Sequence, residues 1–487
     1  MSEFLCVFDV GTTGARTIIF DVNGKEIAKA YEEYPVIDQP VGISEQDPIM
    51  WWNSIKNTCN KVVKSGLFNP DDIIGIVPTY SRLTLTIIDK EGNVLHPALT
   101  WMDEREITDT KTLQEEEGLR RAIPKILWLK NNKPDLFSRA FKVVSIDSFI
   151  YMKLCDNIVT DPTIGIFSFL NMETLKWDES LANTYDINID LLPELKSPGD
   201  VIGELSSETA LELGLKPNIP IILGGGDQQC AALGLGVINP GQEKITTGTG
   251  IFVDLVVESP IPSVGDIPIF SFPHVIKGKW VLEGTMPGTG TMLKWFKDNF
   301  SQWQINESER QNANIYDILS AEAETVSPGS NGLLITPLYI FRKGTIHGLS
   351  WNHTRAHVIR SIMESAALSA QMYSQLLEGM VKVKIPELRV DGGGMNSSFW
   401  AQIFADVTNR DIKIPACKDG AALGAAILGF YGCNRINSIE DGIVKMVNFI
   451  DTKKPIKENV KIYKKLNRLF MPTTLEILNK KRVTKDL

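Results

Sequence analysis

The first thirty-four residues alternate between apolar runs and turn-forming residues. β-favouring residues fill 4–10 and 15–20, and the glycine-rich turn 11–14 separates the two runs. This pattern predicts a β-hairpin. An Asn-Gly pair follows at 23–24 and is typical of a second hairpin turn, so we expect residues 26–34 to continue as a third antiparallel strand.

The next segments add helices and buried strands. Residues 48–65 carry apolar side chains at the spacing of one helix face. Short apolar runs at 73–77 and 85–89 are typical of buried strands. A sheet that begins with an antiparallel hairpin and continues with strands and helices is a mixed α/β fold.

The pattern of the first hairpin returns in the middle of the chain. Residues 244–257 consist of a strand, a Gly-Thr-Gly turn and a second strand, which is similar to residues 9–14 and their flanks. A third glycine turn at 391–394 follows an apolar run. We therefore predict two domains built on one plan, with limits 1–244 and 245–487.

Composition excludes several classes of protein. The 487 residues are 43% apolar and 22% charged, as in an ordinary globular protein, and the net charge of -9 disfavours a nucleic-acid partner. The 6 Cys contain no CxxC pair, which disfavours a zinc ribbon. There is no stretch of about 18 apolar residues, and Glu3 stands where a signal peptide needs a basic residue. We expect a cytoplasmic protein without a membrane partner.

Glycine-rich turns at strand ends are suited to binding phosphate. They expose backbone N–H groups with no Cβ in the way, and Thr adds a hydroxyl. Asp9 lies just before the first turn, and a carboxylate beside a phosphate is explained by a cation between them, usually Mg²⁺. A single turn of this kind is more often a plain hairpin, but three of them favour a nucleotide site.

Two acidic motifs could serve a polar substrate. Asp227 follows three glycines after an apolar strand, where a rigid, accessible carboxylate would accept a proton from a hydroxyl. Taken alone, Asp227 is equally typical of a helix N-cap. Asp103 and Arg105 follow Trp101, a combination that suits a polyol but, taken alone, is more typical of a surface ion pair.

Three longer segments, residues 8–16, 125–132 and 344–364, carry motifs of one family, and together they resemble the FGGY carbohydrate kinases. Residues 8–16 are similar to the family's first phosphate hairpin, residues 125–132 fit half of its first signature, and residues 344–364 fit its second signature throughout. Arg120 and Ala122 depart from the upstream half of the first signature. The resemblance covers residues 5–435.

The resemblance implies two ribonuclease-H-like domains, of the actin, hexokinase and Hsp70 class, around a deep interdomain cleft. It implies that Asp227 is the catalytic base, that the donor is ATP, and that Asp9 positions Mg²⁺ through water. The residues expected to bind ATP are Gly11, Thr12, Thr13, Arg16, Thr249, Gly250, Gly290, Gly392, Gly393 and Asn396.

The resemblance implies that residues 79–84, at the end of a strand, bind the substrate and determine which substrate is used. Glycerol kinases have Arg-Glu and xylulokinases have Met-His where this chain has Arg82-Leu83. The expected substrate-binding residues are Arg82, Leu83, Asp103, Asp227 and Gln228. We expect phosphorylation of a small ketose or linear polyol, xylulose-like first, with glycerol and an autoinducer-2-like compound as alternatives.

Other classes share the implied fold, and fold alone does not decide function. A chaperone or filament protein would lack the substrate-reading segment. A non-catalytic ATP-binding regulatory protein would be expected to lose the base, whereas Asp227 is present. A homodimer is the family-level expectation for assembly.

Overall fold

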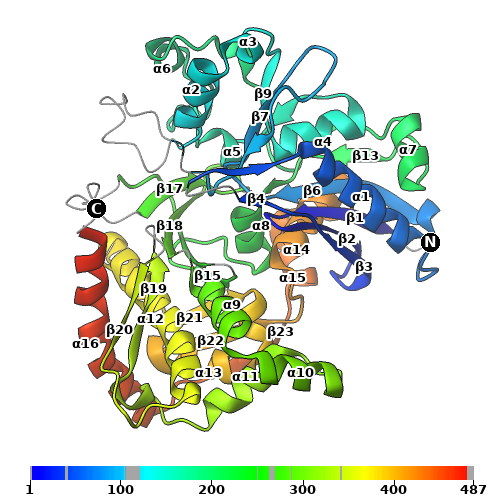
Figure 1. Ribbon diagram of the computed structural model, residues 1–487. Helices are drawn as coiled ribbons and strands as arrows, with labels where there is room; N and C mark the ends of the chain where they lie inside the picture. The colour runs from blue at the N-terminus through cyan, green and yellow to red at the C-terminus, as the bar shows by residue number, and fades with distance from the viewer. Residues whose placement is uncertain are drawn as a thin grey trace. The chain divides into compact units, whose positions relative to one another are not determined.

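A computed structural model describes residues 3–38, 42–103, 105, 121–248, 250–262, 269–286, 288–339 and 343–479. The chain forms two compact units (Figure 1). The first contains Met1–Gly236, Phe272–Trp280 and Asp419–Asn448, and the second contains Val237–Ser271, Val281–Lys418 and Phe449–Leu487. The domain limits 1–244 and 245–487 stay a prediction, because packing defines these units and no single cut of the chain does.

The main sheet of the first unit has the order β12-β13-β6-β1-β2-β3, and β14 also pairs with β6. Strand β1 runs antiparallel to β2 and parallel to β6. The predicted hairpin and its third strand are confirmed. The strands are β1 (Phe4–Val10), β2 (Gly14–Asp21), β3 (Glu26–Glu33), β6 (Ile73–Tyr80), β12 (Val201–Glu204), β13 (Pro220–Ile222) and β14 (Gly225–Gly226).

Three helices of this unit matter most for the site. The predicted helix is α1 (Pro48–Val63), and Asp47 caps it by accepting from the Ile49 amide. Helices α8 (Asp227–Gly234) and α14 (Gly420–Gly432) pack backbone to backbone. A Cβ on Gly424 would lie 1.9 Å from the carbonyl oxygen of Cys230, so only glycine permits this approach. The contact fixes the helix that begins at Asp227.

The rest of the first unit surrounds this core. A five-stranded sheet has the order β4-β5-β8-β7-β9, and β10 pairs with β11. These strands are β4 (Ile37–Asp38), β5 (Ser44–Gln46), β7 (Leu85–Ile88), β8 (Ala98–Leu99), β9 (Lys142–Ser145), β10 (Val159–Thr160) and β11 (Glu194–Leu195). The helices are α2 (Ala122–Asn132), α3 (Pro134–Phe137), α4 (Ile146–Cys155), α5 (Pro162–Gly165), α6 (Glu179–Thr184), α7 (Ser207–Leu213) and α15 (Ile439–Met446).

The second unit is built on the sheet β17-β18-β16-β15-β21-β22-β23. Its second hairpin, predicted from the glycine turn, is confirmed as β15 (Glu243–Thr247) and β16 (Ile251–Val257), and β15 runs parallel to β21 (Glu387–Asp391). The other strands are β17 (Ile269–Pro273), β18 (Trp280–Met286), β19 (Leu334–Tyr339), β20 (Lys343–His347), β22 (Asp411–Pro415) and β23 (Phe449–Lys453).

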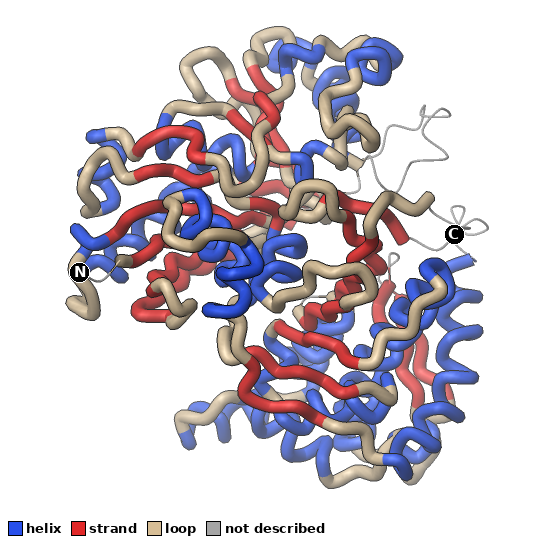
Figure 2. The backbone as a smooth tube through the Cα atoms, turned by 180° about the vertical axis from the view of Figure 1, so that it is seen from behind, coloured by secondary structure: helices blue, strands red, loops and turns tan. Residues whose placement is uncertain are grey.

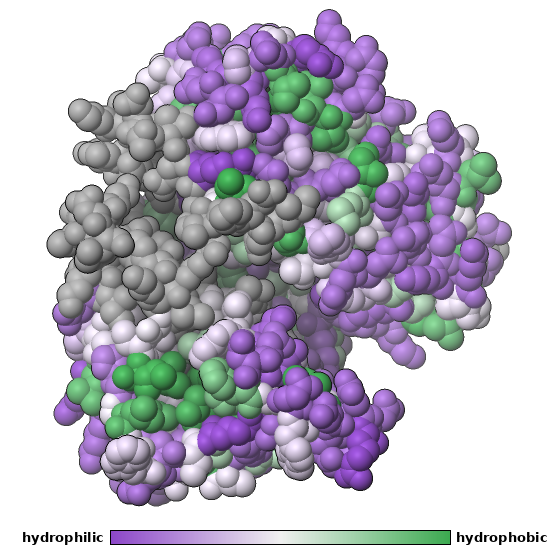
Figure 3. All heavy atoms as spheres, viewed as in Figure 1, coloured by the Kyte–Doolittle hydropathy of each residue, from purple (hydrophilic) through white to green (hydrophobic). Residues whose placement is uncertain are grey.

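Helices border the strands of both sheets (Figure 2). Those of the second unit are α9 (Thr289–Phe300), α10 (Gln302–Gln311), α11 (Ile315–Glu324), α12 (Arg355–Val381), α13 (Ser398–Thr408) and α16 (Lys457–Asn479). Hydrophilic side chains cover most of the described surface on the face drawn in Figure 3. Within the described ranges, no helix has both the length and the apolar character needed to cross a membrane.

Candidate active site

Three carboxylates of the first unit influence one another near the end of β1. Asp9 lies opposite Arg16 in the hairpin register, and Arg16 Nε is 3.5 Å from Asp9 Oδ2. Arg16 Nη1 also donates to Asp419 Oδ1 at 2.5 Å, and Lys29 forms an ion pair with the same carboxylate. Asp419 lies 403 residues from Arg16 in sequence, so its contact with the hairpin could not be predicted from spacing.

The Asp9 carboxyl is poised to change its protonation. Its pKa is raised to about 6: burial is the largest cause, the charges of Asp419 and Asp227 also raise the pKa, and Arg16 and Lys29 lower it. The pKa stays elevated despite the two cations, which means that the negative charge of ionised Asp9 is incompletely balanced. A divalent cation nearby would balance it. Among the described residues, no group of three or more His, Cys, Asp or Glu side chains is arranged to hold a metal ion.

The turn after β1 has the chemistry of a phosphate cradle. Its carbonyl oxygens are all occupied: Tyr34 binds those of Gly11 and Thr13, and Gln46 Nε2 donates to the one of Thr12 at 2.6 Å. In the described part of the chain, the amide N–H groups of Thr12 and Thr13 have no hydrogen-bond partner. A turn that presents N–H groups while its carbonyls are satisfied elsewhere favours an anion.

Asp227 begins helix α8 and keeps its carboxylate accessible. Gly226 is the N-cap and Asp227 the first helical residue, so the N-cap role considered from the sequence does not apply. The side chain is 28% exposed, and Asp227 Oδ1 lies 3.7 Å from Arg82 Nε. The same oxygen accepts from the Gln228 amide at 2.8 Å. The carboxylate is therefore oriented without being enclosed, which a general base needs; that role stays a prediction.

Arg82 is fixed by aromatic rings that the sequence did not reveal. Its guanidinium carbon lies 5.5 Å from the ring centroid of Phe167 and 5.1 Å from that of Phe272. A Cβ on Gly226 would lie 2.9 Å from the Arg82 side chain, so glycine there makes room for it. These contacts hold the cation beside Asp227. Gln228, also predicted to bind substrate, is buried at the start of α8.

Leu83 adopts an unusual backbone conformation. Its φ is 67°, in the left-handed region that branched aliphatic residues avoid. The side chain lines a cavity of about 50 Å³, together with Ile126 and Phe167. Direct contact between Leu83 and a substrate stays a prediction.

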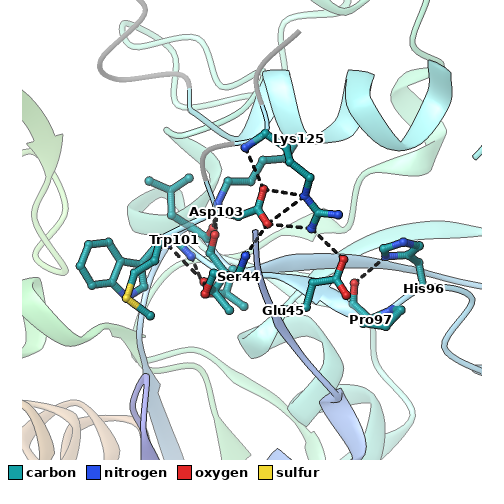
Figure 4. Close-up of polar contacts among 12 residues, drawn as sticks. Ser44, Glu45, His96, Pro97, Trp101, Asp103 and Lys125 are labelled. Atoms are coloured by element: carbon teal, nitrogen blue, oxygen red, sulfur yellow. Dashed lines mark hydrogen bonds and ion pairs between the residues drawn. The ribbon is translucent and has the colours of Figure 1, made fainter. Parts of the chain in front are cut away.

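Asp103 lies in a polar cluster with Ser44 and Glu45 (Figure 4), and Arg105 forms ion pairs with both carboxylates. Its oxygens accept from the Ser44 amide at 2.9 Å and from Arg105 Nη2 at 2.7 Å, and the carboxylate is fully buried. Arg105 also pairs with Glu45 at 2.8 Å. The ion pair of the alternative interpretation is present, but it is buried and does not lie at the surface. Protein donors use these oxygens, so binding of substrate by Asp103 stays a prediction.

In the second unit, the hairpin end and the third glycine turn meet. Thr247 Oγ1 donates to the Asp391 carbonyl at 2.8 Å, and Thr246 Oγ1 donates to Asp391 Oδ1 at 2.7 Å. Gly392 has φ 91°, and a Cβ there would lie 2.3 Å from the Thr247 carbonyl oxygen. The structure thus brings two of the predicted ATP-binding turns together, at Gly250 and at Gly392.

A buried ion pair joins the two strands of the β15–β16 hairpin. Lys244 Nζ is 3.0 Å from Asp254 Oδ2, and both side chains are fully buried. Lys244 also donates to Thr246 Oγ1 at 2.9 Å, which links the ion pair to Asp391.

The remaining predicted nucleotide residues are dispersed in this unit. Gly290 is in the first turn of α9, and Gly393 and Asn396 bound a short 3₁₀ helix after β21. Thr249 lies outside the described residues. ATP binding by this set stays a prediction.

Comparison with known proteins places the chain in a family. Residues 4–234 match the FGGY family of carbohydrate kinases, N-terminal domain, and residues 244–433 match the C-terminal domain of that family. A gluconokinase of Bacillus subtilis (strain 168) is 26% identical over 97% of this chain and 95% of its own length. An autoinducer-2 kinase of Salmonella typhimurium is 28% identical over 95% of this chain and 92% of its own.

A solved xylulose kinase from Lactobacillus acidophilus has the same fold. It superposes with a TM-score of 0.85 at 22% identity and covers 99% of both chains. The mixed α/β structure therefore has the actin-like ribonuclease-H fold of these kinases. The chain belongs to the FGGY family of carbohydrate kinases and is a phosphotransferase for a sugar or polyol. The assignment made from the motifs is confirmed.

Proposed function

We propose that the chain transfers the γ-phosphoryl group of ATP to a hydroxyl of a small linear polyhydroxy compound, with a xylulose-like ketose as the first candidate. The observation that carries this proposal is the accessible Asp227 carboxylate beside Arg82, at the start of a helix fixed by glycine packing. Kinases of this family use ATP as the donor.

The proton and the phosphoryl group move in opposite directions. Asp227 accepts the proton of the acceptor hydroxyl as that oxygen forms a bond to the γ-phosphorus. The bond between the γ-phosphorus and the bridging oxygen breaks, and ADP leaves with the bonding electrons. Asp227 then releases the proton to water. Positioning and neutralisation of charge supply most of the rate in such a transfer.

The nucleotide would be held by elements from both units. The free amides of Thr12 and Thr13 suit phosphate oxygens, and Arg16 adds a cation beside that turn. The turns at Gly250 and Gly392, with Thr249, Gly290, Gly393 and Asn396, would bind the rest of ATP from the second unit. The deep cleft between domains, expected from the family resemblance, is part of this proposal.

Asp9 would hold Mg²⁺, the usual partner of ATP phosphates in kinases, through water.

A second candidate substrate is a linear sugar acid such as gluconate. Arg82 presents a guanidinium next to the proposed base, and Arg pairs with a carboxylate through two parallel hydrogen bonds. The similarity to gluconokinase over nearly the whole chain favours the same choice. Glycerol and an autoinducer-2-like compound remain lower alternatives. A cytoplasmic location and a homodimer complete the proposal.

Coupled ADP release with MgATP tests the function. The panel contains xylulose, ribulose, fuculose, gluconate, glycerol, erythritol and an acyclic diketone. A ketose that stimulates ADP release far above the rate without acceptor supports the first candidate, and gluconate as the best acceptor supports the second. Bound ATP with no stimulation by any compound would contradict both.

A further inference from the structure

Lys125 is a buried cation that faces backbone carbonyls. It lies in the first turn of α2 and is 3% exposed. Its Nζ donates to the carbonyl of Leu83 at 3.2 Å and to the carbonyl of Thr100. In the described part of the chain, no carboxylate lies within ion-pair distance of Nζ, although Asp103 is near in the same cluster (Figure 4). A buried ammonium without an ion pair is costly, so its retention calls for an explanation.

The two carbonyls belong to the two segments that border the proposed acceptor site. Leu83 follows Arg82, which lies beside Asp227. Thr100 precedes Trp101, whose Nε1 donates to Thr12 Oγ1 in the phosphate turn at 2.9 Å. One side chain therefore joins the substrate-reading strand end to the segment that contacts the phosphate turn.

The strand end at Leu83 has an unfavourable backbone conformation and lies beside an open cavity. Leu83 is held at φ 67°, a conformation unfavourable for its side chain. Beside it lies the cavity of about 50 Å³, lined also by Thr84, Ala122 and Ile126. Without an anchor on its carbonyl, the backbone at Leu83 would relax toward an ordinary conformation, and Arg82 would move with it.

We propose that Lys125 is a positioning residue for the acceptor substrate, which fixes the Arg82–Leu83 backbone and the Trp101 segment through their carbonyl oxygens. This inference rests on the proposed function, because it takes the strand end as the acceptor site. It assigns no contact between Lys125 and the reacting atoms.

The electrostatics of the cluster agree with a positioning role. The pKa of Lys125 is lowered to about 7: burial is the largest cause, the charges of Arg121 and Arg105 also lower the pKa, and Asp103 raises it. Arg105 forms ion pairs with Asp103 and Glu45, whereas Lys125 donates hydrogen bonds to the carbonyls of Leu83 and Thr100. Holding its proton therefore costs folding free energy at neutral pH. A purely stabilising role would not favour a cation here.

Lys125→Met tests the inference because it keeps the length and removes the donor. We expect the KM for the best acceptor to rise about tenfold or more, while the KM for ATP stays within about twofold. The midpoint of thermal unfolding should be unchanged or higher. Lys125→Arg, which keeps donors, should raise the acceptor KM less. Lys130→Met is the matched control, since Lys130 is on the same helix and pairs with the exposed Asp186.

Hydrogen exchange supplies a readout that needs no substrate. Amides of residues 81–84 should exchange about tenfold faster in Lys125→Met than in the wild type or in Lys130→Met. Unchanged exchange there would overturn the inference, and so would an unchanged acceptor KM or loss of folding in both Lys125 variants. Absence of kinase activity in the wild type would instead contradict the proposed function, with the exchange result still deciding the anchoring by Lys125.

Discussion

The two hairpins that resemble each other in sequence differ in the burial of their cross-strand charged pairs. In β1–β2, Asp9 lies opposite Arg16, with side chains 13% and 35% exposed. In β15–β16, Lys244 lies opposite Asp254, and both side chains are fully buried. Each hairpin has a parallel strand beside it, β6 in the first unit and β21 in the second.

The difference shows how one backbone plan serves two purposes. Asp9 and Thr246 each stand two residues before the first glycine of their turn. Asp9 keeps an incompletely balanced carboxyl beside open amides. Thr246 is neutral and connects Lys244 to Asp391. The first hairpin is suited to cation and phosphate chemistry, whereas the second uses a buried ion pair to hold a turn in place.

The strongest test removes the proposed base from the first unit. Asp227→Asn keeps the shape of the side chain but cannot accept a proton, so kcat should fall by about 10²–10⁴. The Kd for ATP, measured by calorimetry, should stay within about twofold. Asp186→Asn, on a side chain that is 97% exposed, is the control. Normal turnover in Asp227→Asn would contradict the base assignment.

Asp9→Asn separates function from stability in the first hairpin. Loss of the carboxylate should lower kcat on the order of 100-fold and raise the Mg²⁺ concentration needed for half of the maximal rate. The pKa of Asp9 is raised to about 6, so its ionisation costs folding free energy above that pH. Asn should therefore raise the free energy of unfolding at pH 8 by about 1–3 kcal/mol, measured by denaturant titration. If Asp9→Asn were as active as the wild type and less stable, the carboxylate of Asp9 would serve stability and not function.

Thr246→Val breaks the link in the second hairpin. The substitution leaves Lys244 and Asp391 without the hydroxyl between them, and should lower the free energy of unfolding by about 1–3 kcal/mol. ATP should bind about three- to tenfold more weakly, with the acceptor KM unchanged. Thr246→Ser keeps the hydroxyl and should behave as the wild type. A Val variant with normal ATP affinity would show that the link does not position the nucleotide turns.

Of the predicted effects, the pH dependence of kcat is the smallest at pH values near neutrality. Asp9 is ionised above its pKa of about 6 and protonated below it, so kcat should be level above pH 7 and fall about tenfold per unit well below pH 6. Thr246→Ser should keep this acidic limb. A rate that stays level down to pH 4.5 would show that ionised Asp9 is not required.

Local pattern predicted the elements that carry the turns. Apolar runs broken by Gly and Thr identified both hairpins, and the glycines before Asp227 identified a constrained strand end. The helix after it begins at Asp227, three residues before the apolar run that starts at Cys230. Its first turn, Asp227-Gln228-Gln229, is polar, so hydrophobic periodicity could not detect it.

The residues that hold the site residues in place could not be predicted, because they come from distant parts of the chain. Residues 272–280 and 419–448 join the first unit, which brings Phe272 to Arg82 and Asp419 to Arg16. No spacing rule connects such pairs. The left-handed backbone conformation of Leu83 could not be predicted either, because nothing in a leucine side chain favours it. The buried Lys125 lies within a motif recognised in the sequence, but the carbonyl groups that it contacts could be identified only from the structure.

The most direct test of the account is ³¹P NMR of the wild-type reaction with MgATP and the best acceptor of the panel. The account predicts a new phosphomonoester resonance that grows in step with the loss of ATP, and no such growth in Asp227→Asn. If ATP were consumed only to inorganic phosphate, with no phosphomonoester formed, phosphoryl transfer to a hydroxyl of the acceptor would be contradicted.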